Sequence, residues 1–417
     1  MISASQENPL PLTSHPNTAE GVPTDRPASL PAPLKRITIL QAGMNAAHFA
    51  AMPMLAVLIA GIPGAGAETA GTALAMYFVL SRIGPLVLAP LAERVGLWNT
   101  VTVGLCLRGS AFLFLAFLAW TTAAASGAIA AAALLGLGQA THEAGVYGVM
   151  GRQAAEWRDR LLVLNGQALN VGCVVGPVAG VGLALWSPAI AFVGGGVALL
   201  ALGIWSAAEG SELLRVRAPV DRGFGLSRVL TDRLFLLLCV ALVPFWAVFA
   251  QLFAAFPMLA AEFGGSAAWA NSILIVNGLV GVIALAFVAR WIERGLVLLV
   301  LFVGLAVAFA TVAGTTFVPT LLILLALVVL FSVGESFVMA ASDILTGRHA
   351  DGRSTALYFG CLNASAGIGA AIGGYVGAWD ASGSKGGLLV LAAFGALSIV
   401  PIAIYAAGLK GQRGTAI

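Results

Sequence analysis

The feature that most constrains this chain is a series of long apolar runs, separated by short segments rich in turn-forming and charged residues. Each run reaches about 20 residues, the length an α-helix needs to cross a hydrocarbon core of roughly 30 Å. Only 9% of the residues are charged and 60% are hydrophobic, whereas soluble domains carry roughly a quarter charged residues. A water-soluble fold is therefore excluded, while channels, carriers and receptors remain open.

The apolar runs predict an all-α integral membrane protein with twelve transmembrane helices. Six helices are expected near residues 37–60, 69–91, 98–120, 127–150, 159–185 and 188–206. Six more are expected near residues 233–260, 270–291, 295–314, 320–346, 354–379 and 386–408. These spans divide the chain into a disordered tail at 1–34, a six-helix bundle at 35–206, a linker at 207–229, a second bundle at 230–409 and a tail at 410–417.

The basic residues predict the orientation of the spans, because Lys and Arg are retained on the cytoplasmic side of short loops. If the N-terminus is cytoplasmic, eighteen of the 21 Lys and Arg residues fall in cytoplasmic segments and only Lys385 falls outside. Arg82 and Arg108 lie within predicted spans. We therefore predict a multi-pass protein of the inner (cytoplasmic) membrane with both termini in the cytoplasm.

A sequence repeat divides the chain into two similar halves. The segment FAAMPMLA at Phe49–Ala56 recurs as FAAFPMLA at Phe253–Ala260, 204 residues later. Three further pairs follow in the same order, namely Glu93 and Arg94 with Glu293 and Arg294, Gly151 and Arg152 with Gly347 and Arg348, and Asn170, Gly176 and Gly180 with Asn363, Gly369 and Gly373. Collinear pairs indicate duplication, so we expect two pseudo-symmetric six-helix bundles. Such repeats suit a carrier in which one half rocks against the other around a site near the midplane of the bilayer.

Two motifs carry a resemblance to a known family. The loop after the second predicted helix reads Ala92, Glu93, Arg94, Val95, Gly96, and the fifth helix carries Gly172, Gly176, Pro177 and Gly180. With the twelve spans and the repeat, they make the chain resemble the major facilitator superfamily over nearly its whole length past residue 34. Within that superfamily it looks most like the twelve-helix drug/proton antiporters. The resemblance implies the superfamily fold, alternating access and a cavity lined by the first and seventh helices.

The same motifs suggest how the two halves are held together. Glu93 at the end of the second helix can cap a neighbouring helix or pair with Arg152, and so latch the halves in one state. Ordinary solvated loop charges are the alternative. The predicted latch set is Glu93, Arg94, Gly96, Arg152, Glu293, Arg294 and Arg348. Glycines four residues apart permit close helix packing, so Gly172, Gly176, Pro177, Gly180, Gly369 and Gly373 are expected at the interface between the halves.

The first and seventh helices predict two different walls of a substrate cavity. Gln41, Asn45, His48 and Met52 share one face of the first helix. A shift of 204 residues leads to Phe245, Phe249, Leu252 and Phe256. A polar wall opposite an aromatic wall suits an amphiphilic organic substrate, although core or lipid-facing packing is an equal alternative for the phenylalanines.

Carboxyl groups inside two spans are the predicted proton sites. Gln139, Glu143 and Tyr147 share a face of the fourth helix, beside His142, and the corresponding positions of the tenth helix are Glu335, Met339 and Asp343. Ionisable residues within spans are costly and mark pathways. Glu335 and Glu143 are therefore predicted to bind protons or a cationic substrate group. The accessory residues are His48, His142, Asp343, Arg82 and Arg108, with Gln139 and Met339 among the substrate contacts.

Further polar residues and pairings are open to a second interpretation. Glu143 is the nearest candidate partner for Arg82 and Arg108, and a static pair is as reasonable as a charge relay. Asn165, Gln167, Asn170 and Asn277 are expected mainly to join helices.

The sequence contains no phosphate-binding loop, no HExxH motif and no convincing nucleophile constellation. We therefore predict a transporter and not an enzyme, with no cofactor, no metal and no nucleic acid partner, functional as a monomer in the lipid bilayer. The leading hypothesis is proton-coupled export of a drug-like compound or a metabolite such as a siderophore. The alternatives are proton-coupled uptake by the same fold and a non-transporting membrane sensor or scaffold.

Overall fold

The computed structural model of the chain describes residues 30–121, 125–209, 214, 226–350, 355–381 and 386–414, and these residues form helices and short connections with no β-strand. Eleven helical segments in this part of the chain are long and apolar enough to cross a membrane. A further helix, Ala125–Gly151, contains Gln139, His142 and Glu143 and lies between two of the eleven. With this helix the predicted set of twelve is complete. Residues 1–29 of the predicted tail at 1–34, and most of the predicted linker, lie outside the described residues. The end of the predicted tail is not disordered, because α1 already begins at Ala32.

The N-terminal half contains six spanning segments, the first of which is broken. Its elements are α1 (Ala32–Ala51), η1 (Met52–Met54), α2 (Leu55–Ala60), α3 (Gly66–Val95), α4 (Leu97–Ala119), α5 (Ala125–Gly151), α6 (Ala155–Ala184) and α7 (Pro188–Ala208). The polar α5 packs along α3 and α4, which keeps its amide, imidazole and carboxyl groups away from lipid.

The C-terminal half repeats this arrangement after a short extra helix. Its elements are α8 (Leu226–Thr231), α9 (Arg233–Phe249), η2 (Ala250–Leu252), α10 (Ala255–Gly264), η3 (Ala267–Trp269), α11 (Ala270–Glu293), α12 (Val297–Thr315), α13 (Leu321–His349), α14 (Thr355–Ala381), α15 (Gly387–Ala396) and α16 (Ile399–Gly414). The last helix continues beyond residue 409, where the sequence predicted a tail.

The repeated FAAxPMLA segment is the place where the first helix of each half breaks. In the first half, α1 ends just before Pro53 and a 3₁₀ turn follows. In the second half, α9 ends at Phe249, and α10 begins two residues before Pro257. A proline removes one helical hydrogen bond and collides with the preceding turn, so each copy of the motif interrupts its helix. The sequence predicted both segments as continuous helices. The structure differs from this prediction because each helix is interrupted at the motif.

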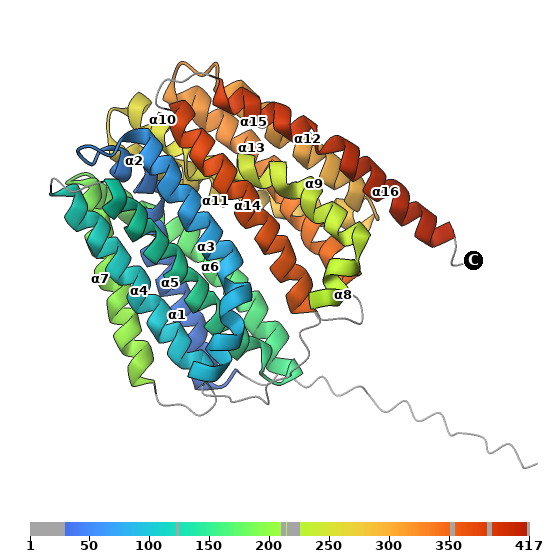
Figure 1. The fold of residues 1–417 in the computed structure, drawn as a ribbon, viewed down its shortest axis with the longest axis horizontal. Helices are drawn as coiled ribbons and strands as arrows, with labels where there is room; N and C mark the ends of the chain where they lie inside the picture. Colours follow the sequence, from blue (N-terminus) through green and yellow to red (C-terminus); the bar gives the residue numbers. More distant parts are fainter. Residues whose placement is uncertain are drawn as a thin grey trace, which may run out of the picture.

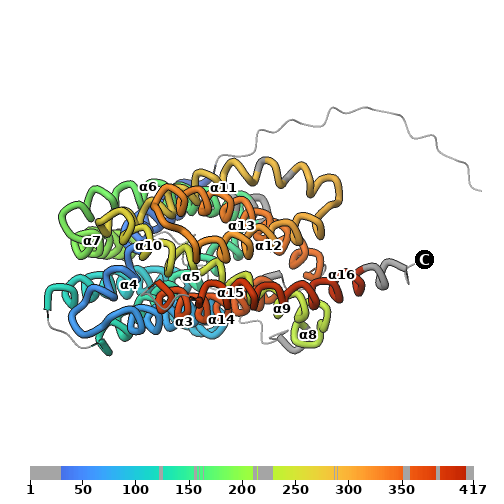
Figure 2. Tube along the Cα trace, turned by 90° about the horizontal axis from the view of Figure 1, so that it is seen from above, coloured from blue at the N-terminus to red at the C-terminus, as the bar shows by residue number. Residues whose placement is uncertain are grey.

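The two halves lie side by side, and their contacts define two sides of the molecule (Figures 1 and 2). We call the side where α1 begins, and where α7 leads to α8, the linker side, and the opposite one the far side. On the far side α10 contacts both η1 and α2, α11 contacts η1, and η3 contacts α6. Along the molecule α3 packs against α14 and α6 against α11. The halves are therefore joined on the far side by the short pieces that follow the helix breaks.

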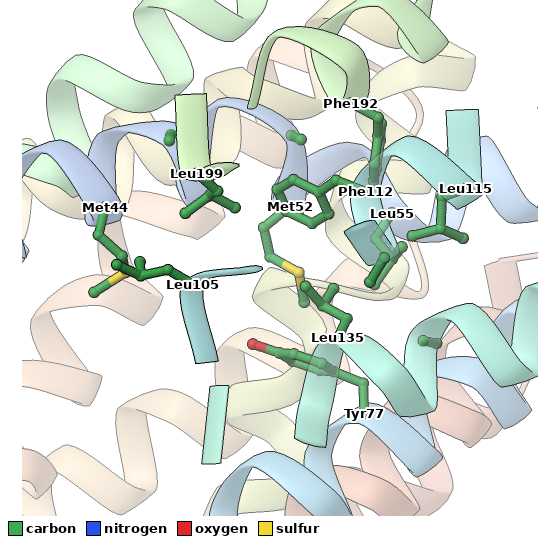
Figure 3. Close-up of a cluster of buried hydrophobic side chains, with 14 of the residues drawn as sticks. Met44, Met52, Leu55, Tyr77, Leu105, Phe112, Leu115, Leu135, Phe192 and Leu199 are labelled. Atoms are coloured by element: carbon green, nitrogen blue, oxygen red, sulfur yellow. The ribbon is translucent and has the colours of Figure 1, made fainter. Parts of the chain in front are cut away.

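Large buried side chains fill the interior of the N-terminal half (Figure 3). They include Met44, Met52, Tyr77, Phe112, Leu135 and Phe192, which come from five spanning segments. Phe49 and Phe253, the first residues of the two repeat copies, pack against both this core and the core of the C-terminal half. The repeat thus provides matching apolar contacts where the halves meet.

The glycines of α6 and α14 pack helices within each half, which corrects the predicted placement between the halves. A side chain at Gly172 or Gly180 would collide with Asn45 or the Ala50 carbonyl of α1. Likewise, Gly369 and Gly373 lie against the Val243 and Ala247 carbonyls of α9. The contact between halves uses other faces of these helices, since Gly367 of α14 lies against Arg82 of α3 and Gly278 of α11 against Cys173 of α6.

Two turns on the linker side support the duplication by their backbone conformation. Gly96, between α3 and α4, has a φ of 103°, and Gly295, between α11 and α12, has a φ of 77°. L side chains rarely adopt these angles. Both turns follow the Glu-Arg pair that the halves share, so sequence and backbone repeat together.

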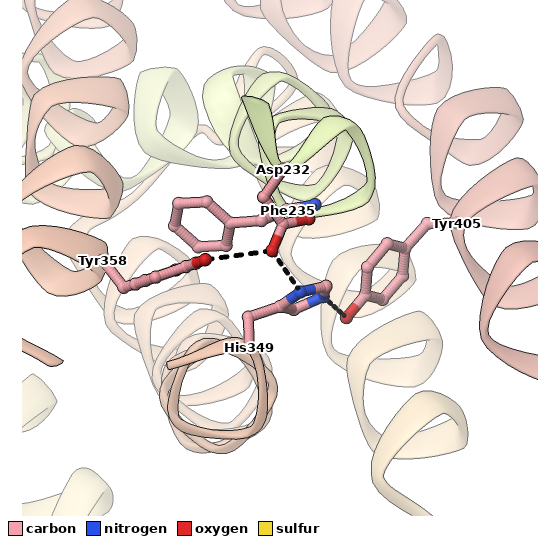
Figure 4. Close-up of polar contacts among 5 residues, drawn as sticks. All are labelled: Asp232, Phe235, His349, Tyr358 and Tyr405. Atoms are coloured by element: carbon pink, nitrogen blue, oxygen red, sulfur yellow. Dashed lines mark hydrogen bonds and ion pairs between the residues drawn. The ribbon is translucent and has the colours of Figure 1, made fainter. Parts of the chain in front are cut away.

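A partly buried hydrogen-bonded cluster ties together four helices of the C-terminal half on the linker side (Figure 4). Asp232 accepts a hydrogen bond from the Phe235 N–H and caps α9. Its other oxygen lies 3.2 Å from Nδ1 of His349 and accepts a hydrogen bond of 3.1 Å from the Tyr358 hydroxyl. Nε2 of His349 lies 3.0 Å from the Tyr405 hydroxyl. The cluster joins the linker-side ends of α9, α13 and α14 to the middle of α16.

Acid should weaken this cluster in a measurable way. Burial opposes ionisation of Asp232, but the Phe235 N–H, His349 and Tyr358 outweigh it and hold the pKa of Asp232 below its usual value. Because the folded pKa is the lower one, the stabilisation is present above the unfolded pKa of about 3.9 and disappears as the pH falls through the folded pKa. We expect Asp232→Asn to lower the melting temperature in detergent by a few degrees at pH 7, and the difference from wild type to shrink below about pH 4. An equal difference at all pH values, or an effect of the same size in the exposed carboxylate variant Glu262→Gln, would contradict this assignment.

Candidate functional site

The candidate site is a polar region between the halves, at the level of the membrane interior and on the linker side. Tyr147 of α5 is 52% exposed, and Asp343 of α13 is also exposed. Tyr147 interacts electrostatically with Asp343 of the other half, as well as with Glu143 and Arg82. A charged side chain is costly against lipid, so these groups indicate a water-accessible space between the two halves that opens to the linker side.

One chain of hydrogen bonds runs from a buried histidine to the carboxylate of α5. The Tyr77 hydroxyl of α3 donates to Oε1 of Gln139 at 2.6 Å, and Nε2 of Gln139 donates to Oε1 of Glu143 at 2.9 Å. Nε2 of His48 lies 3.4 Å from the same hydroxyl, while its Nδ1 has no hydrogen-bond partner. The predicted residues His48, Gln139 and Glu143 are thus brought together, with Tyr77 as the connection.

A second chain links the other buried histidine to the cavity. Nε2 of His142 lies 2.6 Å from Oε1 of Gln41, and Nε2 of Gln41 donates to Oδ1 of Asn165 at 2.8 Å. Nδ2 of Asn165 lies 3.5 Å from the Tyr147 hydroxyl. Amide groups do not readily exchange protons, so both chains orient the groups at their ends and do not themselves conduct protons.

The two arginines of the N-terminal half do not pair with Glu143 in this conformation. Arg108 is 2% exposed; its NH1 donates to the Met44 sulfur at 2.8 Å, and its Nε has no hydrogen-bond partner among the residues that the structure describes. Arg82 is partly exposed on the face of α3 that meets α14. No ion pair within the described residues includes Arg82, Arg108 or Glu143.

The C-terminal half has a partly buried carboxyl group at the middle of α13. Glu335 accepts a hydrogen bond from the amide of Asn277 on α11, which also donates to the Ser332 hydroxyl at 3.0 Å. Asn277 precedes Gly278, which lies against Cys173 of α6. Glu335 is therefore held beside a contact between the two halves, where rocking changes the surroundings.

The predicted walls of the cavity are less accessible than the helical pattern suggested. Asn45 and Met52 are buried, Asn45 against Gly172 of α6. Phe245 and Phe256 are fully buried as well, and Phe256 packs edge-on against Phe331 at 5.6 Å between ring centroids. Phe249 and Met339 are partly exposed. In this conformation, most of the residues predicted for the two walls are therefore buried.

The predicted ion pair at the end of α3 is present, but it joins helices of one half only. NH2 of Arg152 lies 2.7 Å from Oε1 of Glu93, and both residues belong to the N-terminal half. By itself the pair cannot latch the halves together. Arg94, Glu293, Arg294 and Arg348 are exposed, and no ion pair joins Glu293 to Arg348 in the described part of the chain.

Comparison with known proteins places this architecture in a family. A profile described as Major Facilitator Superfamily matches residues 37–313. The chain belongs to the major facilitator superfamily. The match starts in α1 and extends into α12, so it includes nearly all of the N-terminal half and about half of the second bundle.

Individual superfamily members give a more detailed comparison. Multidrug resistance protein MdtH of Salmonella typhimurium (strain LT2) is 26% identical over 227 residues, which are 54% of this chain and 56% of that protein. MdtH of Salmonella newport is 25% identical over an alignment of the same length. The chain thus matches little more than half the length of these curated relatives.

Solved structures agree with the fold over a longer stretch. The POT family transporter PepTSo has a TM-score of 0.73 at 14% identity, covering 92% of this chain and 99% of that one. A POT family transporter in complex with 5-aminolevulinic acid has a TM-score of 0.70 at 13% identity, covering 89% and 95%. These similarities support the superfamily fold of a multi-pass membrane protein.

Two parts of this superfamily member were missed from sequence. Tyr77, the connection between His48 and Gln139, is a single tyrosine in an apolar run, and its polar hydroxyl was the available signal. The cluster around Asp232 and His349 joins residues 117 positions apart, and no local pattern relates them. Both depend on how helices of one half pack together.

Proposed function

We propose that this chain is a secondary active transporter that exports an amphiphilic small molecule in exchange for protons, by alternating access. The observation that carries the proposal is Glu335, a carboxyl group at the middle of α13, held by Asn277 beside the contact of α11 with α6. An intramembrane carboxyl group marks a pathway. Motion of one half against the other would expose Glu335 to water in turn, so that it can bind and release a proton.

The two halves are in contact on one side of the molecule and apart on the other, and this arrangement supports the alternating-access part of the proposal. The far side is joined by η1, α2, α10 and η3, while Tyr147 and Asp343 are exposed toward the linker side. With the linker in the cytoplasm, as the basic residues predict, this conformation is open to the cytoplasm. A carrier that rocks about a central site has such a state in its cycle.

The direction of transport is supported by sequence similarity. The curated relatives whose names are given above are multidrug resistance proteins. Amide and carboxyl groups in the site, together with the partly exposed apolar side chain of Met339 on α13, are suited to an amphiphilic compound. The substrate leaves the cell when protons enter.

The test is transport by the purified full-length protein in proteoliposomes with an imposed pH gradient. A panel of amphiphilic acids, bases and neutral compounds is offered, and movement of each compound against proton flow is recorded with and without a protonophore. We expect at least one compound to be driven opposite to the protons and to stop when the protonophore is added. Movement only in the direction of proton flow would replace antiport by uptake, and no gradient dependence for any compound would overturn proton coupling.

A further inference from the structure

The membrane interior of the N-terminal half contains more basic than acidic side chains. Arg82 of α3 and Arg108 of α4 lie near the middle of their helices, and Glu143 is the single carboxylate at comparable depth in that half. Oε1 of Glu143 already accepts the Gln139 amide, which in turn accepts from Tyr77. No described ion pair includes any of the three charged residues. One positive charge in this half therefore has no internal counterpart.

Arg108 is closed off from any ligand in this conformation. Its side chain is 2% exposed, its NH1 donates to the thioether of Met44, and its Nε has no hydrogen-bond partner among the described residues. A thioether carries no negative charge, and the carboxylate that acts on Arg108 electrostatically, Glu143, makes no ion pair with it in the described part of the chain. Arg108 interacts electrostatically with His48 and Tyr77, and it makes this part of the site positive.

Arg82 is the arginine that a ligand can reach. It is partly exposed, and within the described part of the chain its guanidinium makes no hydrogen bond or ion pair. It lies on the α3 face that meets Gly367 of α14, and it interacts electrostatically with the exposed Tyr147. A partner-free guanidinium at the middle of a span and beside a water-accessible space is costly unless an anion binds it.

We propose that the transported molecule carries an acidic group, a carboxylate, sulfonate or phosphate, and that Arg82 binds it. This inference rests on the transport function proposed above and adds the charge of the substrate. A planar guanidinium forms two parallel hydrogen bonds to such an oxyanion. An anion bound to Arg82 compensates the second positive charge of this half, for which Glu143 alone does not suffice. The positive charge of Arg108 strengthens the attraction of the anion to this region.

A competing partner for Arg82 lies in the opposite half. Asp343 is an exposed carboxylate that faces the same space, since it also interacts with Tyr147. When the linker side closes, Asp343 could approach Arg82 and serve as an internal counter-ion. In that case the acidic substrate is unnecessary, so the experiment must separate the two possibilities.

The experiment compares binding of matched acids and amides to the purified full-length protein. The probes are naphthalene-2-carboxylate and dodecanoate, each with its primary amide, and dodecyl sulfonate, measured by thermal stabilisation and calorimetry. We expect the acids to bind at least about tenfold more tightly than the amides. Arg82→Gln should remove that preference and Arg82→Lys should retain part of it. The control is Arg290→Gln, which removes an exposed guanidinium at the linker-side end of α11 and should leave the preference unchanged.

Several results would overturn the acidic substrate. They are equal binding of acids and amides to the wild-type protein, no acid binding across the panel, and an acid preference that Arg82→Gln leaves intact. If Arg82→Gln and Asp343→Asn impair transport equally and no acid preference exists, Asp343 is the partner of Arg82. Proton-driven transport of a cationic compound that is unaffected by Arg82→Gln would overturn this inference and leave the proposed function. Acid binding that depends on Arg82, without any proton-driven transport, would support this inference and overturn the proposed function.

Discussion

Glu335→Gln is expected to abolish accumulation of substrate against its gradient while leaving substrate exchange intact. The glutamine amide has nearly the shape of a protonated carboxyl group, and its oxygen can still accept the hydrogen bond from Asn277. The change therefore removes the proton site with little effect on packing between α11 and α13. Gradient-driven transport should fall at least about tenfold, whereas exchange of labelled for unlabelled substrate, which needs no net proton movement, should continue.

The control for this prediction is Glu68→Gln, which removes an exposed carboxylate at the far-side end of α3. It should transport like the wild-type protein. Both reactions are measured in the same proteoliposomes, so a loss of protein is distinguished from a loss of coupling. If Glu335→Gln accumulates substrate at the wild-type rate, the proton is carried elsewhere, and Glu143 becomes the first candidate.

Gly373→Val is expected to prevent correct packing of α14 on α9. A β-carbon at Gly373 would overlap with the carbonyl oxygen of Ala247, a backbone atom that cannot move without displacing α9. Overpacking of a well-filled contact costs about 3 kcal/mol or more. The purified variant should therefore be aggregated on size-exclusion chromatography, or melt well below the wild-type protein.

A matched control is available in α6. Gly166 lies in the middle of that helix, and an added β-carbon would meet nothing within 4 Å. Gly166→Ala should therefore be neutral or stabilise the protein by up to about 1 kcal/mol, because alanine favours the helix. A monodisperse Gly373→Val protein with a wild-type melting temperature would mean that α9 and α14 do not pack as described.

Most of the helices could be predicted from sequence because length and hydropathy indicate which segments cross a bilayer. The sequence also predicted a helix near 127–150, although α5 is not among the eleven segments that are long and apolar enough. The repeat was visible for a similar reason, since FAAxPMLA and the Glu-Arg turns retain their letters in both halves. The helix breaks at Pro53 and Pro257 were missed, although proline supplied the signal. The residues at the breaks are as apolar as those of the helices around them, so hydropathy alone does not indicate where the helices break.

The contacts of individual side chains were much harder to predict. Helical spacing correctly brought Gln139 next to Glu143, because residues four apart are neighbours on a helix. Spacing could not tell which face of α6 meets α1 and which meets α11, so the glycines were assigned to the wrong contact. Nor could it show that Arg108 has a sulfur atom and not a carboxylate beside it. These facts depend on the rotation of each helix about its axis, which packing determines.

The measurement that tests the central claim most directly follows two distances across the halves in one protein. Spin labels are placed at Leu162 of α6 and Phe287 of α11, exposed positions on the linker side, and separately at Leu185 and Trp269, exposed positions on the far side. The four native cysteines are first replaced. Distances are recorded at pH 5 and pH 8 for the wild-type protein and for Glu335→Gln.

If a proton on Glu335 controls the rocking of two rigid halves, the two distances should respond to pH in opposite ways. A change of pH should move the linker-side and far-side distances in opposite directions in the wild-type protein, and Glu335→Gln at pH 8 should resemble the wild-type protein at pH 5. Distances that remain constant at both pH values, or that change in the same direction on both sides, would contradict alternating access controlled by this carboxyl group.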